Sequence, residues 1–202
     1  MTRSGQHLTT WQWMAGAFCM GLLVLLLSRT LTTIPGVDLR ATARWSFVLF
    51  WLGTCGGALS RLFGARFEGL ARRARDLSLA YAAAHLVHLA IVVRILSTQP
   101  LPPLSELLLF GIAVFWTYLL AFLSITQWSA RLSPALWRVI RIVGVEYIAL
   151  AFLIDFTKNP LDGGFFKAAY YLPFQLLAFA GPLLRLAAYI KRSVGKRRSV
   201  LA

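Results

Sequence analysis

The sequence LSLAYAAAHLVHLAIVVRIL, residues 77–96, has the length and the apolar character of one membrane-spanning helix. A helix needs about 20 predominantly apolar residues to cross the ~30 Å hydrocarbon core of a bilayer. Apart from two histidines, His85 and His88, its one charged side chain is Arg94, near the end. We therefore expect residues 77–96 to cross a membrane as a single helix.

Five further stretches have the same character, at about residues 11–31, 45–62, 104–126, 136–156 and 165–189. The 202-residue chain is 58% hydrophobic and 14% charged, whereas soluble domains carry about 25% charged residues. No small-x-small cleavage site follows residues 11–31, so this stretch is interpreted as a retained span. The prediction is an all-α membrane protein, a six-helix bundle that forms one domain over residues 1–202.

The second of these stretches, residues 45–62, contains the run Gly53-Thr54-Cys55-Gly56-Gly57. These residues lower its hydropathy and make it the weakest of the six as a span. Gly53 and Gly57 are four residues apart, a spacing that lets two helices approach closely. We expect this close approach within the chain rather than between two copies.

The basic residues give the bundle a direction. If the N-terminus is cytoplasmic, 14 of the 21 basic residues lie on the cytoplasmic side, 6 lie on the opposite side, and Arg185 lies within the last span. The cytoplasmic set is Arg3, Arg61, Arg66, Arg72, Arg73, Arg75, Arg131, Arg138, Arg141, Lys191, Arg192, Lys196, Arg197 and Arg198; the opposite set is Arg29, Arg40, Arg44, Arg94, Lys158 and Lys167. This positive-inside bias predicts that both termini are cytoplasmic.

The net charge of +14 does not indicate a nucleic-acid-binding protein. Basic residues that bind DNA or RNA gather on one soluble face, whereas these stand in short blocks between apolar stretches. Residues 190–202 are interpreted as a basic cytoplasmic tail that contacts anionic lipid head groups.

Three ionisable residues fall near the middle of the predicted spans. At ~1.5 Å per residue from the cytoplasmic side, His85 lies ~12 Å, His88 ~16 Å and Glu146 ~15 Å into the bilayer. If their helices touch, a histidine–glutamate hydrogen bond would offset part of the burial cost. Such groups either handle protons or orient a ligand, or they lock two helices together through a polar contact.

The chain offers little room for other kinds of site. A nucleotide, flavin or nicotinamide site needs a soluble domain or a glycine-rich fingerprint after a strand, and neither is present. Cys19 and Cys55 stand alone within apolar runs, with no Cys-x-x-Cys motif or Cys/His cluster, so no zinc or iron–sulfur site is expected. Electrons, if any pass through the bundle, would have to come from a partner protein.

A family resemblance is carried by several segments between residues 40 and 156. Residues 71–77, Ala-Arg-Arg-Ala-Arg-Asp-Leu, and 81–86, Tyr-Ala-Ala-Ala-His-Leu, resemble the start of the third helix of ferric-reductase-like transmembrane domains. Residues 44–53 resemble the second helix of that family. Residues 123–126 and 136–138 resemble the end of its fourth helix and the start of its fifth. The resemblance extends to the heme-binding membrane subunit of the methionine sulfoxide reductase system.

The resemblance implies a transmembrane electron-transfer protein in a bacterial-type inner membrane, with a b-type heme and His85 as its axial ligand. His88 is a weaker candidate, because two histidines three residues apart cannot clamp one iron from opposite sides. The family's fifth helix carries two further histidines. Here the corresponding positions are Arg141 and Ile154 or Asp155 in one alignment, and Val143 takes the first position in another. Arg141 therefore stands with Glu146 as a polar residue of the fifth span.

Three functions remain open on the sequence. The first is a ferric-reductase-like protein that carries one single-histidine heme or has lost heme while keeping the fold. The second is a non-enzymatic membrane accessory or assembly subunit with a protein partner. The third is a small transporter, for which no inverted repeat is evident.

Overall fold

The computed structural model describes residues 4–32, 34, 36–157 and 164–201, and only the backbone of residues 4–9, 164–170 and 195–201. Its elements are α1 (Ser4–Leu31), α2 (Val37–Phe63), η1 (Ala65–Phe67), α3 (Glu68–Arg72), α4 (Ala74–Thr98), α5 (Leu104–Ile125), η2 (Trp128–Arg131), α6 (Pro134–Thr157) and α7 (Gly164–Leu201). The predicted all-α class is confirmed, because all regular structure in these ranges is helical.

Each of the six predicted stretches lies in one long helix, and the differences are at the ends. The second helix begins at Val37, eight residues earlier than expected, and α7 continues as a helix to Leu201 through the predicted basic tail. Arg3 and Lys158, two residues of the charge count, lie outside the described residues.

Five helices are long and apolar enough to cross a membrane. They are the segments Thr10–Leu31, Val37–Phe63, Ala74–Thr98, Leu104–Ile125 and Tyr171–Val194. Among the helices of 18 residues or more, the one that does not meet this measure is α6, whose 24 residues include Arg138, Arg141, Glu146 and Asp155. It is long enough to cross a membrane, and it fails the measure because of its ionisable residues.

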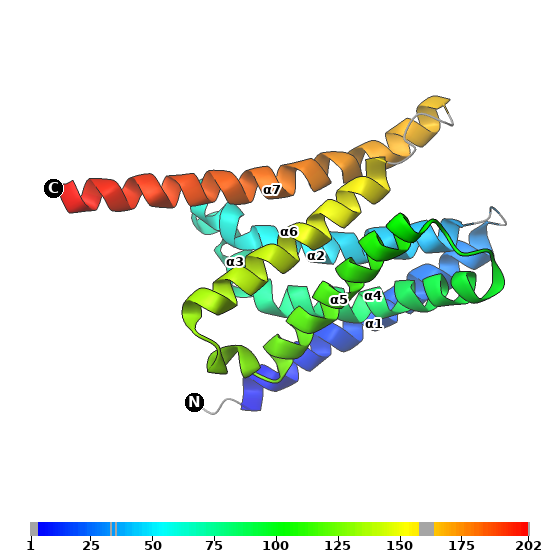
Figure 1. The fold of residues 1–202 in the computed structure, drawn as a ribbon, viewed down its shortest axis with the longest axis horizontal. Helices are drawn as coiled ribbons and strands as arrows, with labels where there is room; N and C mark the ends of the chain where they lie inside the picture. Colours follow the sequence, from blue (N-terminus) through cyan, green and yellow to red (C-terminus); the bar gives the residue numbers. More distant parts are fainter. Residues whose placement is uncertain (1–3, 33, 35, 158–163, 202) are drawn as a thin grey trace.

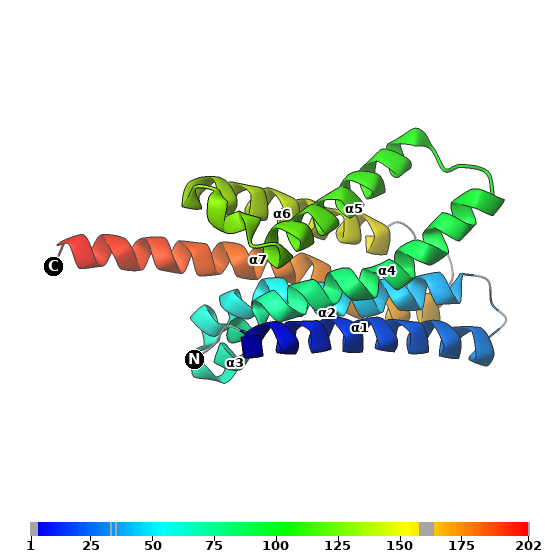
Figure 2. The same cartoon turned by 90° about the horizontal axis from the view of Figure 1, so that it is seen from below.

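The helices form two connected groups. Helices α1, α2 and α4 pack side by side, α7 lies along α2 and crosses α6, and α5 pairs with α6 (Figure 1). The turned view shows α5 and α6 standing off from the α1–α2–α4 group on the side of α4 (Figure 2). Helix α7 thus contacts both α2 and α6 and lies between the two groups.

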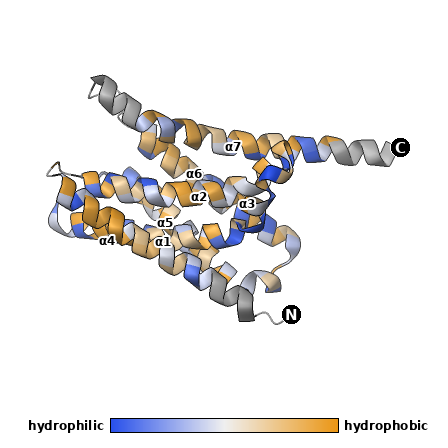
Figure 3. Cartoon of the chain, turned by 180° about the vertical axis from the view of Figure 1, so that it is seen from behind, coloured by the Kyte–Doolittle hydropathy of each residue, from blue (hydrophilic) through white to orange (hydrophobic). Residues whose placement is uncertain are grey.

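The connections fall at two opposite ends (Figure 1). The start of α1, the α3 segment, the α5–α6 connection and the end of α7 share one end, whereas the α1–α2 and α4–α5 connections lie at the other. Hydrophobic residues run along the helices, and hydrophilic residues gather toward the ends, densely around α3 (Figure 3). At the α3 end, Lys191 Nζ donates to the carbonyl of Arg61 at 2.9 Å, and Arg75 donates to the carbonyl of Ser124 at 2.8 Å.

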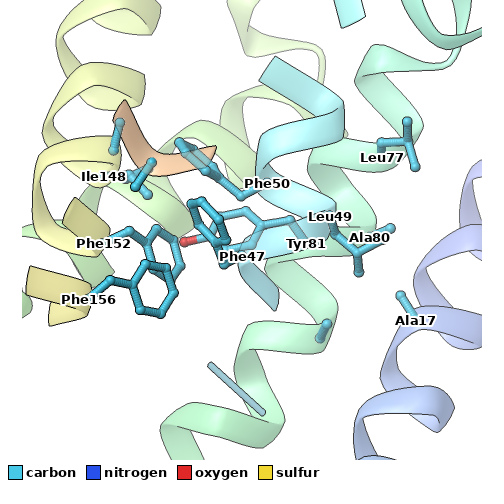
Figure 4. Packing of buried hydrophobic residues seen from close by; sticks show 13 residues of the cluster. Ala17, Phe47, Leu49, Phe50, Leu77, Ala80, Tyr81, Ile148, Phe152 and Phe156 are labelled. Atoms are coloured by element: carbon cyan, nitrogen blue, oxygen red, sulfur yellow. The ribbon is translucent and has the colours of Figure 1, made fainter. Parts of the chain in front are cut away.

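An aromatic core joins α2, α4 and α6. Figure 4 shows Phe47, Phe50 and Tyr81 gathered against Phe152 and Phe156. The Phe47 ring lies 5.0 Å from that of Phe152 and 4.9 Å from that of Phe156, and the Phe50 ring lies 5.2 Å from that of Tyr81. Tilted and edge-to-face rings at these separations contribute beyond the area they bury.

Two tryptophans fasten α2 to the helices beside it. The indole N–H of Trp45 donates to the carbonyl of Ala17 on α1 at 3.0 Å. The indole N–H of Trp51 donates to the carbonyl of Leu177 on α7 at 2.8 Å. A buried tryptophan needs such an acceptor, so these bonds fix how α1 and α7 lie against α2.

The glycines of α2 set its distance from α4. A Cβ on Gly53 would lie 2.7 Å from Ser78 Oγ and 2.9 Å from the Ser78 backbone nitrogen, whereas a Cβ on Gly57 would meet nothing within 4 Å. The expected close approach therefore takes place at Gly53. A neighbouring contact is made by Gly56, whose Cβ would lie 3.0 Å from the Leu70 carbonyl oxygen.

We expect Gly53→Ala to lower the free energy of unfolding by about 1–3 kcal/mol, because the α4 backbone has to move away from the added methyl group. Gly57→Ala is the matched control and should be neutral or slightly stabilising, since alanine favours a helix. Thermal unfolding of both variants in one detergent measures the difference. Equal melting temperatures would contradict the close contact at Gly53.

Candidate functional site

His85 and His88 lie together on one face of α4. Their rings are stacked with centroids 5.2 Å apart and planes inclined by 29°. The side chain of Tyr81, one turn before His85, lies on the same face, and its ring centroid is 5.4 Å from that of His85. The three side chains form a polar stripe along α4 that faces the aromatic core.

Aromatic rings from two other helices approach His85. The Tyr118 ring of α5 and the Phe152 ring of α6 each lie 6.5 Å from the His85 ring. His85 Nδ1 and the Tyr118 hydroxyl are buried, and neither has a hydrogen-bond partner among the described residues. Tyr81 differs, because its hydroxyl lies 2.9 Å from Thr117 Oγ1.

His88 is held by a hydroxyl group of α2. Its Nδ1 lies 3.3 Å from Thr42 Oγ1, and Thr42 Oγ1 lies 2.9 Å from the carbonyl of Asp38. Thr42 Oγ1 is also within hydrogen-bond distance of the carbonyl of Leu39, at 3.1 Å. The Thr42 hydroxyl therefore links the His88 ring to the backbone at the start of α2.

Glu146 does not pair with a histidine. Arg185 of α7 donates to both oxygens of the Glu146 carboxylate, from Nε at 2.8 Å and from Nη2 at 2.7 Å. This two-bond geometry is the strong form of an arginine–carboxylate pair. The histidine–glutamate hydrogen bond considered from the sequence is therefore replaced by an ion pair between α6 and α7.

The third guanidinium nitrogen of Arg185 faces α2. Its Nη1 lies 3.5 Å from Thr54 Oγ1 and 3.6 Å from Cys55 Sγ. The Cys55 thiol in turn lies 3.9 Å from the carbonyl of Gly181 on α7. Polar groups from α2, α6 and α7 thus meet around one guanidinium group.

In the sequence, Arg185 stands out only as a charge inside the last span, and the cluster around it is not predicted. A signal was available, because an arginine in the interior of an apolar helix requires a carboxylate or several acceptors. Arg141 does not belong to the cluster. It is exposed, and five residues separate it from Glu146, which is about 140° around the helix.

A second buried arginine lies near the opposite end of α2. The Arg44 guanidinium lies 4.8 Å from the ring centroid of Tyr171 and 4.9 Å from that of Phe174, both on α7. Cation–π contacts of this kind stabilise a desolvated arginine. The charge pattern of the sequence predicts Arg44 at the outer surface, whereas in the structure its relative exposure is only 6%.

Comparison with protein families, with curated proteins and with solved structures gives no match for this chain. In the described ranges, no three His, Cys, Asp or Glu side chains are grouped so as to hold a metal ion. The geometry around His85, His88 and Arg185 is therefore the basis for a functional proposal.

We expect Glu146→Leu or Arg185→Leu alone to lower the free energy of unfolding by about 3–5 kcal/mol, because each leaves an uncompensated charge in the bundle. The double variant Glu146→Leu/Arg185→Leu removes both charges and should recover most of this loss. Denaturant unfolding in detergent of the four proteins gives the coupling energy of the pair.

The matched control is the exposed pair between Arg72 and Glu68, whose nitrogen and oxygen are 3.8 Å apart. Glu68→Leu should change the stability by less than about 1 kcal/mol. A Glu146 variant that is no more destabilised than the Glu68 variant would show that the Arg185–Glu146 pair does not hold the helices.

Proposed function

We propose that the chain is a six-span integral membrane protein with both termini in the cytoplasm, built on a ferric-reductase-like scaffold that works without heme as an accessory or assembly subunit. The five apolar helices support the membrane location. The resemblance described from residues 40–156 suggests a bacterial-type inner membrane.

The course of the chain supports α6 as the remaining span. Helix α5 ends at the same end of the bundle as α3, and α7 begins at the opposite end, so α6 has to cross between them (Figure 1). The charge of Glu146 is neutralised by Arg185, which lowers the cost of placing it at mid-depth. Arg138 and Arg141 lie in the first two turns and can extend toward the cytoplasmic head groups.

The basic residues support the orientation. The segments at the α3 end carry ten basic residues, and those at the other end carry four. The first set is Arg61, Arg66, Arg72, Arg73, Arg75, Arg131, Arg138, Arg141, Lys191 and Arg192; the second is Arg29, Arg40, Arg44 and Arg94. The denser end is expected on the cytoplasmic side.

The observation that carries the heme-free proposal is the side chain that faces His85 from α6. It is Phe152, which has no lone pair to offer an iron atom. The ring of Phe152 is also packed between those of Phe47 and Phe156, at 5.0 and 5.9 Å. A porphyrin is wider than any of the ring separations around His85, so it could lie there only by displacing these rings.

The hydrogen bonds of the two histidines also support the heme-free proposal. An imidazole that ligates a metal almost always donates its other N–H to a fixed acceptor. His85 Nδ1 has no such partner in the described part of the chain. His88 Nδ1 does have a hydrogen-bond partner in Thr42, but the His88 ring is stacked on that of His85. The residues present therefore do not fit a heme on His85, and no electron-transfer step is derived for this chain.

We expect detergent-purified protein, from cells grown with ample iron, to show no Soret absorption band, in the wild type as in His85→Ala. A b-type cytochrome expressed in the same host is the positive control. A Soret band in the wild type that His85→Ala abolishes would overturn the heme-free proposal and restore His85 as an axial ligand.

The orientation is tested with reporter fusions in a bacterial host. Green fluorescent protein fused after Ala202 should fluoresce, and alkaline phosphatase at that position should be inactive. Alkaline phosphatase inserted after Gln99, between α4 and α5, should be active, and the same insertion after Gly64 is the cytoplasmic control. The reverse pattern would overturn the assignment of the two ends.

A further inference from the structure

The Glu146 carboxylate is bonded on one side and open on the other. Its side chain is 43% exposed, whereas that of its partner Arg185 is 16% exposed. Val139, Val143 and Leu150, which are 56%, 46% and 46% exposed, are separated from Glu146 by 7, 3 and 4 residues. Residues at these spacings share one face of a helix, so Glu146 lies on the outward face of α6.

This face would be an unfavourable surface for lipid. If the chain spans a membrane as proposed above, Glu146 lies near mid-depth, where no water solvates its remaining lone pairs. Lipid tails offer no hydrogen-bond donors, and a polar side chain at this depth normally faces protein or a water-filled cavity. The other residues of the face are apolar and would be stable against lipid or protein alike.

We propose that the α6 face formed by Leu136, Val139, Val143, Glu146 and Leu150 binds a transmembrane helix of a partner subunit, and that this helix presents a neutral hydrogen-bond donor to Glu146. The inference rests on the proposed function and names the surface through which the accessory subunit acts.

The spacing of the five residues favours a helix as the occupant. Successive members are separated by 3, 4, 3 and 4 residues, the repeat with which one helix packs along another at a small crossing angle. A single polar residue within such an apolar seam fixes the register of the two helices. Glu146 would take this role, since it is the one polar member of the five.

The charge balance favours a neutral donor. The Arg185–Glu146 pair carries no net charge, so a second basic or acidic group from the partner would leave one charge unbalanced at mid-depth. A hydroxyl, amide, phenol or indole group supplies the donor without a charge. A second copy of this chain is disfavoured, because a two-fold interface on this face would place Glu146 opposite Glu146, and an ionised carboxylate offers no donor to the other.

The test places a photoreactive amino acid at Val143 in the full-length chain, expressed in its native membranes. Matched control positions are Phe115 on α5 and Leu26 on α1, which are also exposed and apolar, at 59% and 60%. The cross-linked peptide is identified by mass spectrometry. The expected product at Val143 is a different membrane protein, joined within a transmembrane helix and within about one turn of a Ser, Thr, Asn, Gln, Tyr or Trp residue, with only lipid adducts at both control positions.

A second measurement ties the product to Glu146. In the double variant Glu146→Leu/Arg185→Leu, which leaves no lone charge, the yield of the Val143 product should fall about threefold, as expected for one interhelical hydrogen bond in a membrane. A retained melting temperature shows that this variant is folded. An unchanged yield would overturn the role of Glu146 in binding the partner.

Other products would overturn the proposal in distinguishable ways. A product with a second copy of the chain would mean a homodimer, and lipid adducts alone at Val143 would mean an uncovered face. A partner helix without a neutral donor near the cross-link would reject the chemistry proposed here. Failure of the proposed function itself is recognised separately, because a chain that does not span the membrane would be released by alkaline extraction.

Discussion

The bundle depends on the neutralisation of Arg185 inside it. Helix α7 is apolar around this residue, and a guanidinium group there has to find a carboxylate and further acceptors. It finds Glu146 on α6, and Thr54 and Cys55 on α2. Because the two bonds to Glu146 have a fixed direction, they set the rotation and the depth of α6 and α7 together. The rest of α6, including its outward face, is positioned by this pair.

The aromatic core provides the second constraint. Rings from α2, α4 and α6 fill the interior beside His85, and the residue that α6 places against His85 is Phe152, with ring centroids 6.5 Å apart. The polar stripe of α4 remains, but its members have different partners: Tyr81 has Thr117, His88 has Thr42, and His85 has aromatic neighbours. The heme-free proposal rests on these contacts.

Helix α6 connects these two constraints to the proposed interaction with a partner. Its inner side carries Phe152 and packs into the core, while Glu146 holds α7 and also reaches the outward face. A helix with so many ionisable residues is weak as an independent span, and this weakness is offset by protein contacts. An accessory subunit would gain from such a helix, because the feature that makes it unfavourable in lipid makes it specific for a partner.

The sequence by itself determined the six helices, because each apolar stretch has the length of a span and is bounded by polar residues. It also predicted that His85 and His88 share a face, since helical geometry alone requires it. Only the tertiary structure decided the partner of each polar group. Residues 39 positions apart, such as Glu146 and Arg185, meet through the crossing of two helices, and no local pattern encodes that crossing. The same reason explains why Gly53 rather than Gly57 makes the close contact, and why Phe152 faces His85.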